Sequence, residues 1–272
     1  MKEAVKAFAD ILRTAFGKEK KKPMTTAIIV AAGNSTRMKS QTSKQFLILD
    51  GMPVLARTLR AFEQAKTIDK IIIVAKEEDH PQILTLCNKY NIKKPYKLVT
   101  GGETRQDSVL CGFKKISDNT NFVAIHDGAR CLITPHDIDR VCSYAYKEGA
   151  ASAATPVTDT VKMTSSQNFI DYDTQLDRNK IWLVQTPQVF GVNLYRAAAY
   201  TAKENGFIAT DDNALVENIK YNIKLVPCRR DNIKITTSDD LILAKLYIDL
   251  YSETINSENP PFEIIDEEKN SD

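Results

Sequence analysis

Between residues 25 and 250, short apolar segments alternate with longer segments whose apolar residues recur every three or four positions. The short segments have the length and the Ile and Val content of buried strands, whereas the longer ones predict helices with one apolar face. Strands that alternate with helices form βαβ units, so the pattern predicts an α/β fold with a mainly parallel central sheet. The expected strands are 26–31, 70–75, 96–99, 122–126, 151–156 and 222–226, and the expected helices are one that starts near Pro53 and others at 81–90, 104–117, 135–148, 191–204, 211–220 and 238–250.

The segment 157–180 interrupts this alternation. Residues 157–163 alternate as a strand does, a polar turn follows at 165–168, and residues 169–172 would form a returning strand. The sequence therefore predicts a β-hairpin that projects from the sheet. Because a long hairpin is marginally stable alone in water, we expect it to pack against a second subunit.

Two further segments flank the α/β region. Residues 1–24 carry apolar side chains such as Val5, Phe8 and Leu12 at the spacing of an amphipathic helix. This helix could pack on its own domain or on a partner, extend loosely, or lie on an anionic membrane, and we favour packing or a loose extension. Residues 251–272 are mostly polar and acidic and predict a disordered tail.

Composition narrows the class of protein. The formal net charge of +2 gives no overall signature of nucleic-acid binding. The five cysteines are scattered and never form a C-x-x-C pair, which argues against a disulfide framework and against a structural zinc site. Since the sequence also contains no apolar run of transmembrane length and no signal-peptide core, we expect a cytoplasmic protein.

The first expected strand runs directly into a loop of small residues that is followed by two cations. Small residues let backbone N–H groups approach a phosphate, and open α/β sheets bind ligands at the carboxyl ends of their strands. The loop is neither a P-loop nor a dinucleotide fingerprint. It indicates a nucleotide-handling enzyme, although a solvated turn with two surface cations is the alternative. The residues concerned are Ala31, Ala32, Gly33, Arg37 and Lys44.

A glycine pair, Gly101 and Gly102, follows a later strand and opens a helix. The backbone N–H groups at that helix start, together with the Ser108 hydroxyl, are placed to hydrogen-bond a base or a ribose. The alternative is a flexible turn in which Thr104 caps the helix.

Two charged residues lie near other strand ends. Asp127 follows the strand 122–126, where a carboxylate suits a ribose hydroxyl or an Mg²⁺ ion that bridges phosphates, or else satisfies local backbone donors. Lys234 lies between two isoleucines on a short expected strand, so its side chain should point away from them, toward a cleft or toward water.

Eight segments of the chain, in order and without large gaps over residues 25–250, resemble the 2-C-methyl-D-erythritol 4-phosphate cytidylyltransferases of the non-mevalonate isoprenoid pathway, the IspD family. As a set the segments are specific, although each alone is weak. The resemblance implies a Rossmann-like nucleotidyltransferase fold with a β-arm, here about 157–180, that forms a homodimer. The segments are A-A-G-N-S-T-R-M (31–38), S-K-Q-F (43–46), G-G-E-T-R-Q-D-S-V (101–109), H-D-G-A-R (126–130), P-V-T-D-T-V-K (156–162), D-R-N-K-I-W-L-V-Q-T-P-Q-V-F (177–190), A-T-D-D (209–212) and D-N-I-K-I-T (231–236).

The resemblance also implies roles for single residues. The CTP phosphates would be surrounded by Ala31, Ala32, Gly33 and Arg37, with Lys44 beside them. The cytosine would be recognised at Gly102, Glu103 and Ser108, and the ribose and a metal would lie near Asp127 and Gly128. The methylerythritol phosphate would be held by Arg130, Thr186, Thr210 and Lys234, and by Thr160 and Arg178 reaching in from the arm of the partner subunit.

The implied reaction joins CTP to 2-C-methyl-D-erythritol 4-phosphate and releases pyrophosphate. The attacking phosphate is already an anion, so no general base is needed, and catalysis would rest on positioning and on stabilising charge. Arg37 and Lys44 would contact the α-phosphate and the pyrophosphate, Mg²⁺ would bridge the phosphates, and Lys234 and Arg178 would hold the incoming phosphate.

Two positions depart from the family pattern. Cys131 and Ser43 stand where the family usually has proline, and both changes allow more freedom to the loops that carry Arg130 and Lys44.

Several alternatives stay open. A ribitol-5-phosphate cytidylyltransferase uses the same chemistry, but its relatives resemble A-G-G at the first loop and lack the R-x-x-S-V and D-R-N-x-I-W segments. A non-catalytic nucleotide-binding protein is disfavoured because both Arg37 and Lys44 are retained. A glycosyltransferase would need a D-x-D motif, whereas Asp211-Asp212 and Asp239-Asp240 suit helix capping. No G-x-S-x-G motif supports a serine hydrolase.

Overall fold

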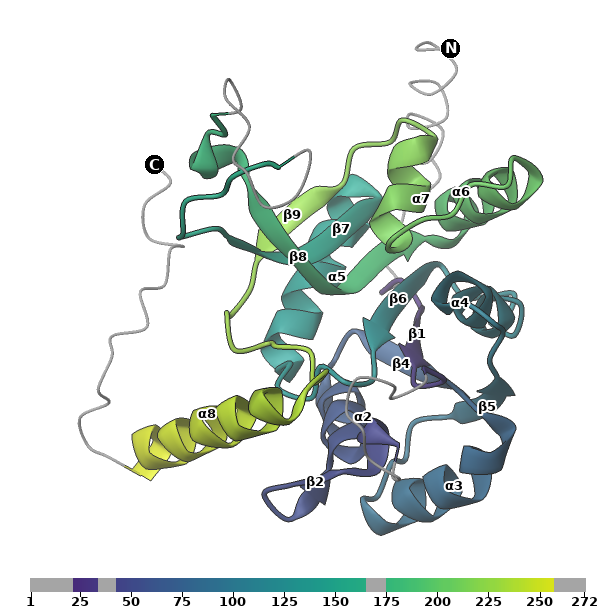
Figure 1. Cartoon of the computed structure of the whole chain (residues 1–272). Coiled ribbons are helices and arrows are strands. Elements are labelled where there is room, and N and C mark those ends of the chain that lie inside the picture. Colours follow the sequence, from purple (N-terminus) through teal and green to yellow (C-terminus); the bar gives the residue numbers. More distant parts are fainter. Residues whose placement is uncertain (1–21, 34–42, 165–174, 257–272) are drawn as a thin grey trace.

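The computed structural model describes residues 22–33, 43–164 and 175–256, and within them it contains a seven-stranded sheet in the order β5-β4-β1-β6-β8-β7-β9 (Figure 1). The strands are β1 (Thr25–Val30), β4 (Ile68–Ala75), β5 (Tyr96–Thr100), β6 (Phe122–Asp127), β7 (Ala150–Pro156), β8 (Trp182–Gly191) and β9 (Lys224–Pro227). The helices are α2 (Val54–Gln64), α3 (His80–Lys89), α4 (Arg105–Phe113), α5 (Pro135–Glu148), α6 (Val192–Glu204), α7 (Asp212–Asn218) and α8 (Ser238–Asn256). The expected α/β class and the six expected strands are confirmed.

The sheet is parallel except for β8, which pairs antiparallel with both β6 and β7. This strand was not expected, since the sequence around it contains Pro187 and three polar residues. Proline lacks the N–H that a ladder needs and is confined to edges and bulges. The β7–β8 register shifts between Ser152 and Ala154, opposite residues 185–187, so the proline lies in an irregular part of the ladder.

Helices cover both faces of the sheet (Figure 1). Side chains of β1 alternate between the faces, as strand geometry requires. Ile29 belongs to the core formed with α2, α3 and α5, which includes Phe62. Ile28 belongs to the core formed with α4, α6 and α7, which includes Phe113 and Tyr195. The result is a three-layer arrangement in which the sheet is buried on both faces.

The parallel registers bring four loops to one edge of the sheet. Val30 lies opposite both Val74 and Asp127, and Ala75 lies opposite Thr100. The carboxyl ends of β1, β4, β5 and β6 therefore coincide, and the loops that leave them meet at the place where α/β sheets bind ligands.

Small elements complete this edge. The 3-10 helices η2 (Lys44–Phe46) and η3 (Glu77–Asp79) lie beside it, and η4 (Arg178–Lys180) precedes β8. A short hairpin joins β2 (Ile48–Leu49) to β3 (Met52–Pro53) through Asp50 and Gly51, both with positive φ, as a two-residue Asp-Gly turn requires. Residues of this hairpin, of α8 and of the loop after β6 form a third apolar cluster.

The expected hairpin at 157–180 is only partly described. The structure assigns no strand to residues 157–164, so the strand predicted at 157–163 is wrong for the single chain. The β7–β8 pairing ends with Pro156 opposite Trp182, followed by one hydrogen bond from the Val157 N–H to the Ile181 carbonyl at 3.1 Å. A two-stranded ribbon that packs against nothing else is only marginally stable in water, which accounts for the early end of the strand pairing. The turn at 165–168 and the residues 169–172 lie outside the described residues.

The chain ends also differ in part from the expectation. Helix α8 continues to Asn256, beyond residue 250, where the tail was predicted to begin. The Arg229 guanidinium lies 3.8 Å from the centroid of the Tyr251 ring, a cation–π contact that holds this last part of the helix. The amphipathic segment lies outside the described residues up to residue 21, as do residues 257–272.

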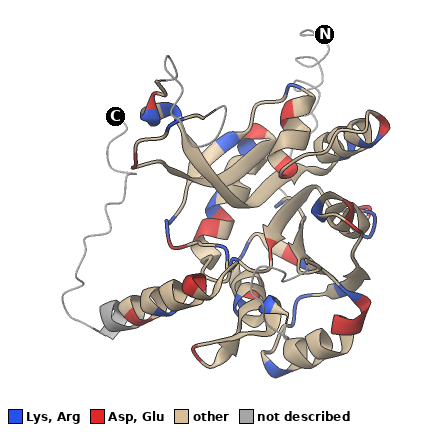
Figure 2. Cartoon of the chain, in the orientation of Figure 1, with Lys and Arg blue, Asp and Glu red and all other residues tan. Residues whose placement is uncertain are grey.

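Charged residues of both signs are interspersed over the helices and loops (Figure 2). In the part of the chain that the structure describes, none of the helices combines the length and the apolar character that crossing a bilayer requires.

Candidate functional site

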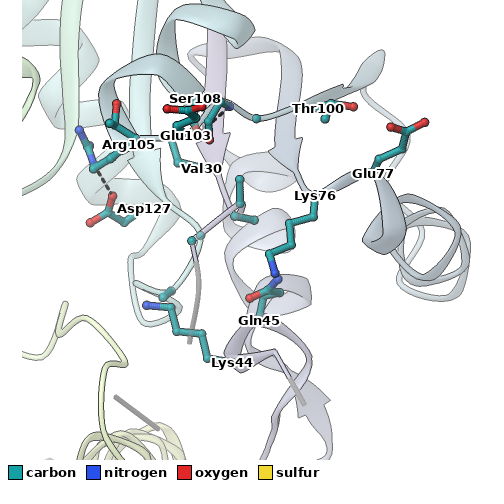
Figure 3. A pocket seen from close by; sticks show the side chains of 18 of the residues that line it. Val30, Lys44, Gln45, Lys76, Glu77, Thr100, Glu103, Arg105, Ser108 and Asp127 are labelled. Atoms are coloured by element: carbon teal, nitrogen blue, oxygen red, sulfur yellow. Dashed lines mark hydrogen bonds and ion pairs between the residues drawn. The ribbon is translucent and has the colours of Figure 1, made fainter. Parts of the chain in front are cut away.

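A cavity of about 590 Å³ opens where the carboxyl ends of β1, β4, β5 and β6 meet (Figure 3). The loop after β1 and the loop after β5 form two of its walls, η2 and η3 form another, and the segment around Lys234 closes it. Ten of the site residues that the family resemblance implies line this one cavity. They are Ala31, Ala32, Gly33, Lys44, Gly102, Glu103, Ser108, Asp127, Gly128 and Lys234.

The loop after β1 and the glycine pair after β5 lie in close contact. A Cβ atom on Gly101 would lie only 2.6 Å from the Cβ of Ala32 and 2.8 Å from Oγ of Ser108, so no larger residue fits there. The Gly102 N–H donates to Ser108 Oγ at 3.1 Å. Thr104 caps α4 in a capping box with Asp107, so its predicted role as N-cap is confirmed. The same turn therefore begins α4 and also forms a tightly packed wall of the cavity.

Lys44 enters the cavity from the first position of η2. The neighbouring Gln45 is buried and donates its amide to the Asp79 carboxylate at 2.9 Å, which ties η2 to η3. Lys76, at the end of β4, lines the same cavity (Figure 3). Two lysines from different elements thus supply positive charge beside the loop of small residues.

Asp127 is the carboxylate on which the cations of the site converge. Its Oδ1 lies 3.2 Å from Nε of Arg105, and its Oδ2 lies 2.8 Å from Nζ of Lys234 and 3.9 Å from Nε of Arg130. Burial opposes ionisation of Asp127, but the three positive charges outweigh burial and hold its pKa well below the usual range. Of the two orientations left open for Lys234, toward a cleft or toward water, the structure shows the first, since Lys234 lines the cavity. The strand predicted around it is wrong, because residues 231–236 form no strand.

Thr186 and Arg130, two residues expected at the second substrate, are tied into the loop after β6. The Arg130 guanidinium donates to the Asn232 carbonyl at 2.7 Å. The Thr186 side chain is buried, and its Oγ1 accepts from the Asp127 N–H at 3.1 Å. Both residues therefore fix the backbone and the side chains around Asp127.

His126 completes this arrangement, and sequence reasoning did not assign it a role. Its Nε2 lies 3.1 Å from the Arg130 carbonyl, which can only accept, so Nε2 carries the proton. Its Nδ1 then accepts from the Thr186 hydroxyl at 3.0 Å. Burial lowers the pKa of His126 to about 4, so the ring is neutral and this chain of hydrogen bonds persists at neutral pH.

Three other predicted residues, Thr160, Arg178 and Thr210, do not line this cavity. Thr160 and Arg178 lie together around a second hollow, of about 510 Å³, at the base of the arm, where Arg178 donates to the Thr158 carbonyl at 3.0 Å. Thr210 is exposed in the loop before α7. Arg37 lies outside the described residues.

Comparison with known proteins identifies the family. The sequence model of the IspD family, described as 2-C-methyl-D-erythritol 4-phosphate cytidylyltransferase, matches residues 25–250. The chain is 42% identical over 224 residues to the protein of that name from Caldanaerobacter subterraneus subsp. tengcongensis, covering 82% of this chain and 98% of the relative. The chain belongs to the 2-C-methyl-D-erythritol 4-phosphate cytidylyltransferase family.

Other members of this cytidylyltransferase family agree in sequence and in fold. The protein of the same name from Syntrophus aciditrophicus is 41% identical over 233 residues, covering 84% of this chain and 97% of the relative. The crystal structure of 4-diphosphocytidyl-2C-methyl-D-erythritol synthase from Anaerococcus prevotii superposes with a TM-score of 0.75 at 30% identity, covering 84% of this chain and all of that one. The cytidylyltransferase from Thermus thermophilus superposes with a TM-score of 0.67 at 29% identity, covering 83% of this chain.

The described residues of this cytidylyltransferase contain no group of three or more His, Cys, Asp or Glu side chains arranged to hold a metal ion. Asp127, in the wall of the cavity, offers carboxylate oxygens, the donor type that Mg²⁺ prefers. Mg²⁺ typically binds to one or two carboxylates together with substrate phosphates, so this donor set fits an ion that arrives with the nucleotide.

Sequence reasoning missed several side chains that line the cavity of this cytidylyltransferase, among them Arg105, Gln45 and Lys76. Arg105 and Gln45 lie inside the segments on which the family resemblance rests, but the resemblance assigned a role to neither of them. For Arg105 a signal was available, because it directly follows the glycine turn and opens a helix whose start faces the carboxyl edge of the sheet.

Proposed function

We propose that this protein transfers the cytidylyl group of CTP to 2-C-methyl-D-erythritol 4-phosphate, giving 4-diphosphocytidyl-2-C-methyl-D-erythritol and pyrophosphate for isoprenoid precursor biosynthesis. The observation that carries the proposal is that Lys44, Lys234, Asp127 and the two glycine-containing loops line one cavity. Family membership supports the same substrates. A ribitol phosphate acceptor is not favoured by these relatives.

The nucleotide would lie along the carboxyl edge of the sheet. Its base and ribose would contact the turn of Gly102, Glu103 and Ser108, with the ribose near Gly128, since backbone N–H groups at a helix start suit polar groups of the ligand. Its phosphates would lie along the loop from Ala31 to Gly33, beside the Lys44 ammonium. Arg37 is proposed as a further phosphate ligand.

The acceptor's phosphate would attack the α-phosphorus of CTP. A bond forms between a phosphate oxygen and that phosphorus, while the bond to the leaving pyrophosphate breaks. Because the nucleophile is already an anion, the protein need not remove a proton from it. The protein would instead neutralise the negative charge of the two approaching anions. Lys44 would stabilise the charge that grows on the α-phosphate and on the pyrophosphate.

Lys234 would hold the incoming phosphate. In this structure its ammonium is paired with Asp127 at 2.8 Å, and its side chain is about one-third exposed. An arriving phosphate would therefore find a lysine that lies at the cavity wall and can exchange one anion for another. Arg130, Thr186 and Thr210 would shape the same side of the site.

Mg²⁺ would be held by the CTP phosphates with Asp127 as a protein ligand, and it would supply neutralisation of phosphate charge. We further propose that two copies of the chain pair through the arm, so that Thr160 and Arg178 of the partner subunit complete each site. All five cysteines are free, which fits a reducing cytoplasm.

The decisive experiment offers the purified protein CTP, ATP, GTP or UTP together with either methylerythritol phosphate or ribitol phosphate, and measures pyrophosphate. We expect release with CTP and methylerythritol phosphate in the presence of Mg²⁺. Faster release with ribitol phosphate would favour the related cytidylyltransferase. No release with any pair, from protein that binds CTP, would favour a non-catalytic binding protein.

A further inference from the structure

Arg105 connects two carboxylates that belong to different elements. It is the first residue of α4, and its Nε lies 3.2 Å from Oδ1 of Asp127 at the end of β6. Its Nη1 lies 2.7 Å from Oδ2 of Asp212, the first residue of α7. A planar guanidinium presents donors in several fixed directions, so it can bond to both carboxylates at once, which a single ammonium does poorly.

The Asp212 end of this bridge is firmly anchored. The side chain of Asp212 is only 1% exposed, and its other oxygen accepts from the Tyr195 hydroxyl at 2.7 Å. The Asp212 N–H donates to Oε1 of Gln188 at 3.0 Å, which ties the start of α7 to the interior strand β8. Arg105 is thus attached to the rigid interior on one side and to the active-site carboxylate on the other.

The two oxygens of Asp127 have different partners. Arg105 contacts Oδ1, whereas Lys234 contacts Oδ2. If Lys234 turns to a substrate phosphate, Oδ2 loses its nearest cation and only Arg130, at 3.9 Å, remains on that side. The Oδ1 contact does not involve Lys234, so it can persist through this exchange.

A merely structural ion pair accounts less well for the position of Arg105. Its side chain is 28% exposed and lines the cavity, so it is not a core group (Figure 3). A cation at the first position of a helix is also disfavoured by the helix dipole. Both features fit a side chain placed for the carboxylate at the site.

We propose that Arg105 is a positioning residue of the cytidylyl transfer, which holds the Asp127 carboxylate in place from the buried Asp212 while Lys234 exchanges Asp127 for the incoming phosphate. This inference rests on the proposed function. Arg105 acts through Asp127, so its loss should impair turnover more than nucleotide binding. Small displacements of catalytic groups typically cost up to about a hundredfold in rate.

The test compares Arg105→Gln and Arg105→Lys with Arg60→Gln, a matched control at an exposed arginine of α2. Pyrophosphate release gives kcat and KM for CTP, and circular dichroism reports the fold. For Arg105→Gln we expect kcat to fall about 10–100-fold and KM to change less than kcat. Arg105→Lys should recover part of the loss, and Arg60→Gln should behave as the unaltered protein.

A double-mutant cycle distinguishes positioning from a general structural role. If Arg105 acts through Asp127, then adding Arg105→Gln to Asp127→Asn should leave kcat unchanged relative to Asp127→Asn alone. A structural role would instead multiply the two losses. Asp212→Asn, which removes the charge of the anchor and keeps Arg105, provides a second variant should Arg105→Gln fail to fold, and it should lower kcat in the same direction by a smaller factor.

Three results would overturn the inference. They are an unimpaired kcat in Arg105→Gln, a loss confined to KM, and losses that multiply in the Asp127→Asn background. These results differ from failure of the proposed function, in which the unaltered protein itself would release no pyrophosphate from CTP and methylerythritol phosphate, and the inference would fall with it.

Discussion

Lys44 lines the main cavity from the first position of η2, so its placement depends on one turn of 3-10 helix. Gln45 and Phe46 of that turn are buried, while Lys44 itself is partly exposed. The backbone of the turn is therefore held independently of the Lys44 side chain. Because removing one preorganised charged donor typically costs about 10²–10³ in turnover, we expect Lys44→Ala to lower kcat by that factor while the fold survives. Pyrophosphate release and thermal unfolding measure the two effects.

The control for this variant is Lys203→Ala, which removes an exposed lysine of α6 away from the cavity. It should leave kcat unchanged. Near-normal turnover of Lys44→Ala would remove this lysine from the catalytic residues.

His126 gives a pH dependence of stability with a definite sign. Burial lowers its pKa in the folded protein to about 4, below the unfolded value of about 6.5. As the pH falls below about 6.5 the unfolded chain binds a proton that the folded chain does not, so the free energy of unfolding decreases until about pH 4. The full difference is roughly 3 kcal/mol. Urea unfolding between pH 4 and pH 8 measures it.

His126→Gln should flatten this pH dependence, whereas His136→Gln, at an exposed histidine of α5, should leave it as it is. An equally steep loss of stability in His126→Gln would show that other groups, such as paired carboxylates, cause the acid sensitivity.

At the scale of secondary-structure elements, the start of α4 combines a capping box with a wall of the cavity. Thr104 Oγ1 accepts from the Asp107 N–H at 3.0 Å. Thr104→Ala should lower the free energy of unfolding by about 1 kcal/mol, because a helix N–H loses its partner. Since the same turn positions Gly102, the affinity for CTP should also fall. Urea unfolding and equilibrium binding of CTP test both effects, with Thr85→Ala on α3 as the control.

The sequence predicted those elements whose pattern reflects burial alone. The strand β1, with Ile28 and Ile29 buried on opposite faces, is an example. It could not predict β8, because Pro187 and the polar side chains of Gln185 and Gln188 are typical of a loop. In the structure those amides are buried but bonded, for instance by Gln188 to Asp211 at 2.8 Å. These hydrogen bonds join residues that are distant in sequence, so the local sequence pattern does not indicate them.

The candidate site likewise contains features that the sequence predicted and features that it could not predict. Loops that leave parallel strands had to meet at one edge, so the grouping of Gly33, Gly102 and Asp127 followed from the expected topology. The contacts of His126 with Thr186 and of Arg105 with Asp212 link β6 to β8 and α4 to α7. Neither pair is close in sequence, and β8 was not expected, so these positioning contacts could not be derived. The small hairpin at Asp50-Gly51, by contrast, carried a readable turn signal that was overlooked.

At the scale of the whole molecule, the predicted site residues that the structure describes fall into two groups, which line different hollows. Lys44 and Lys234 line the main cavity, whereas Thr160 and Arg178 line the hollow at the arm. An arm that serves the site of another copy would reconcile this separation with a single reaction. The same arrangement would account for the early end of the β7–β8 pairing, since the packing partner of the arm would be a second subunit.

Mixed dimers test this sharing of sites directly. In a shared site, Lys44 comes from one protomer and Arg178 from the other, so homodimers of Lys44→Ala and of Arg178→Ala each lack one component in both sites. A dimer that combines the two variants contains one intact site, because the protomer with Arg178→Ala supplies Lys44 and its partner supplies Arg178. Random exchange of subunits should therefore restore about one quarter of the unaltered activity, since half of the dimers are mixed and half of their sites are intact. The two variants mixed without exchange give the baseline, and activity that stays at this baseline after verified exchange would place Arg178 in the site of its own protomer or outside any site.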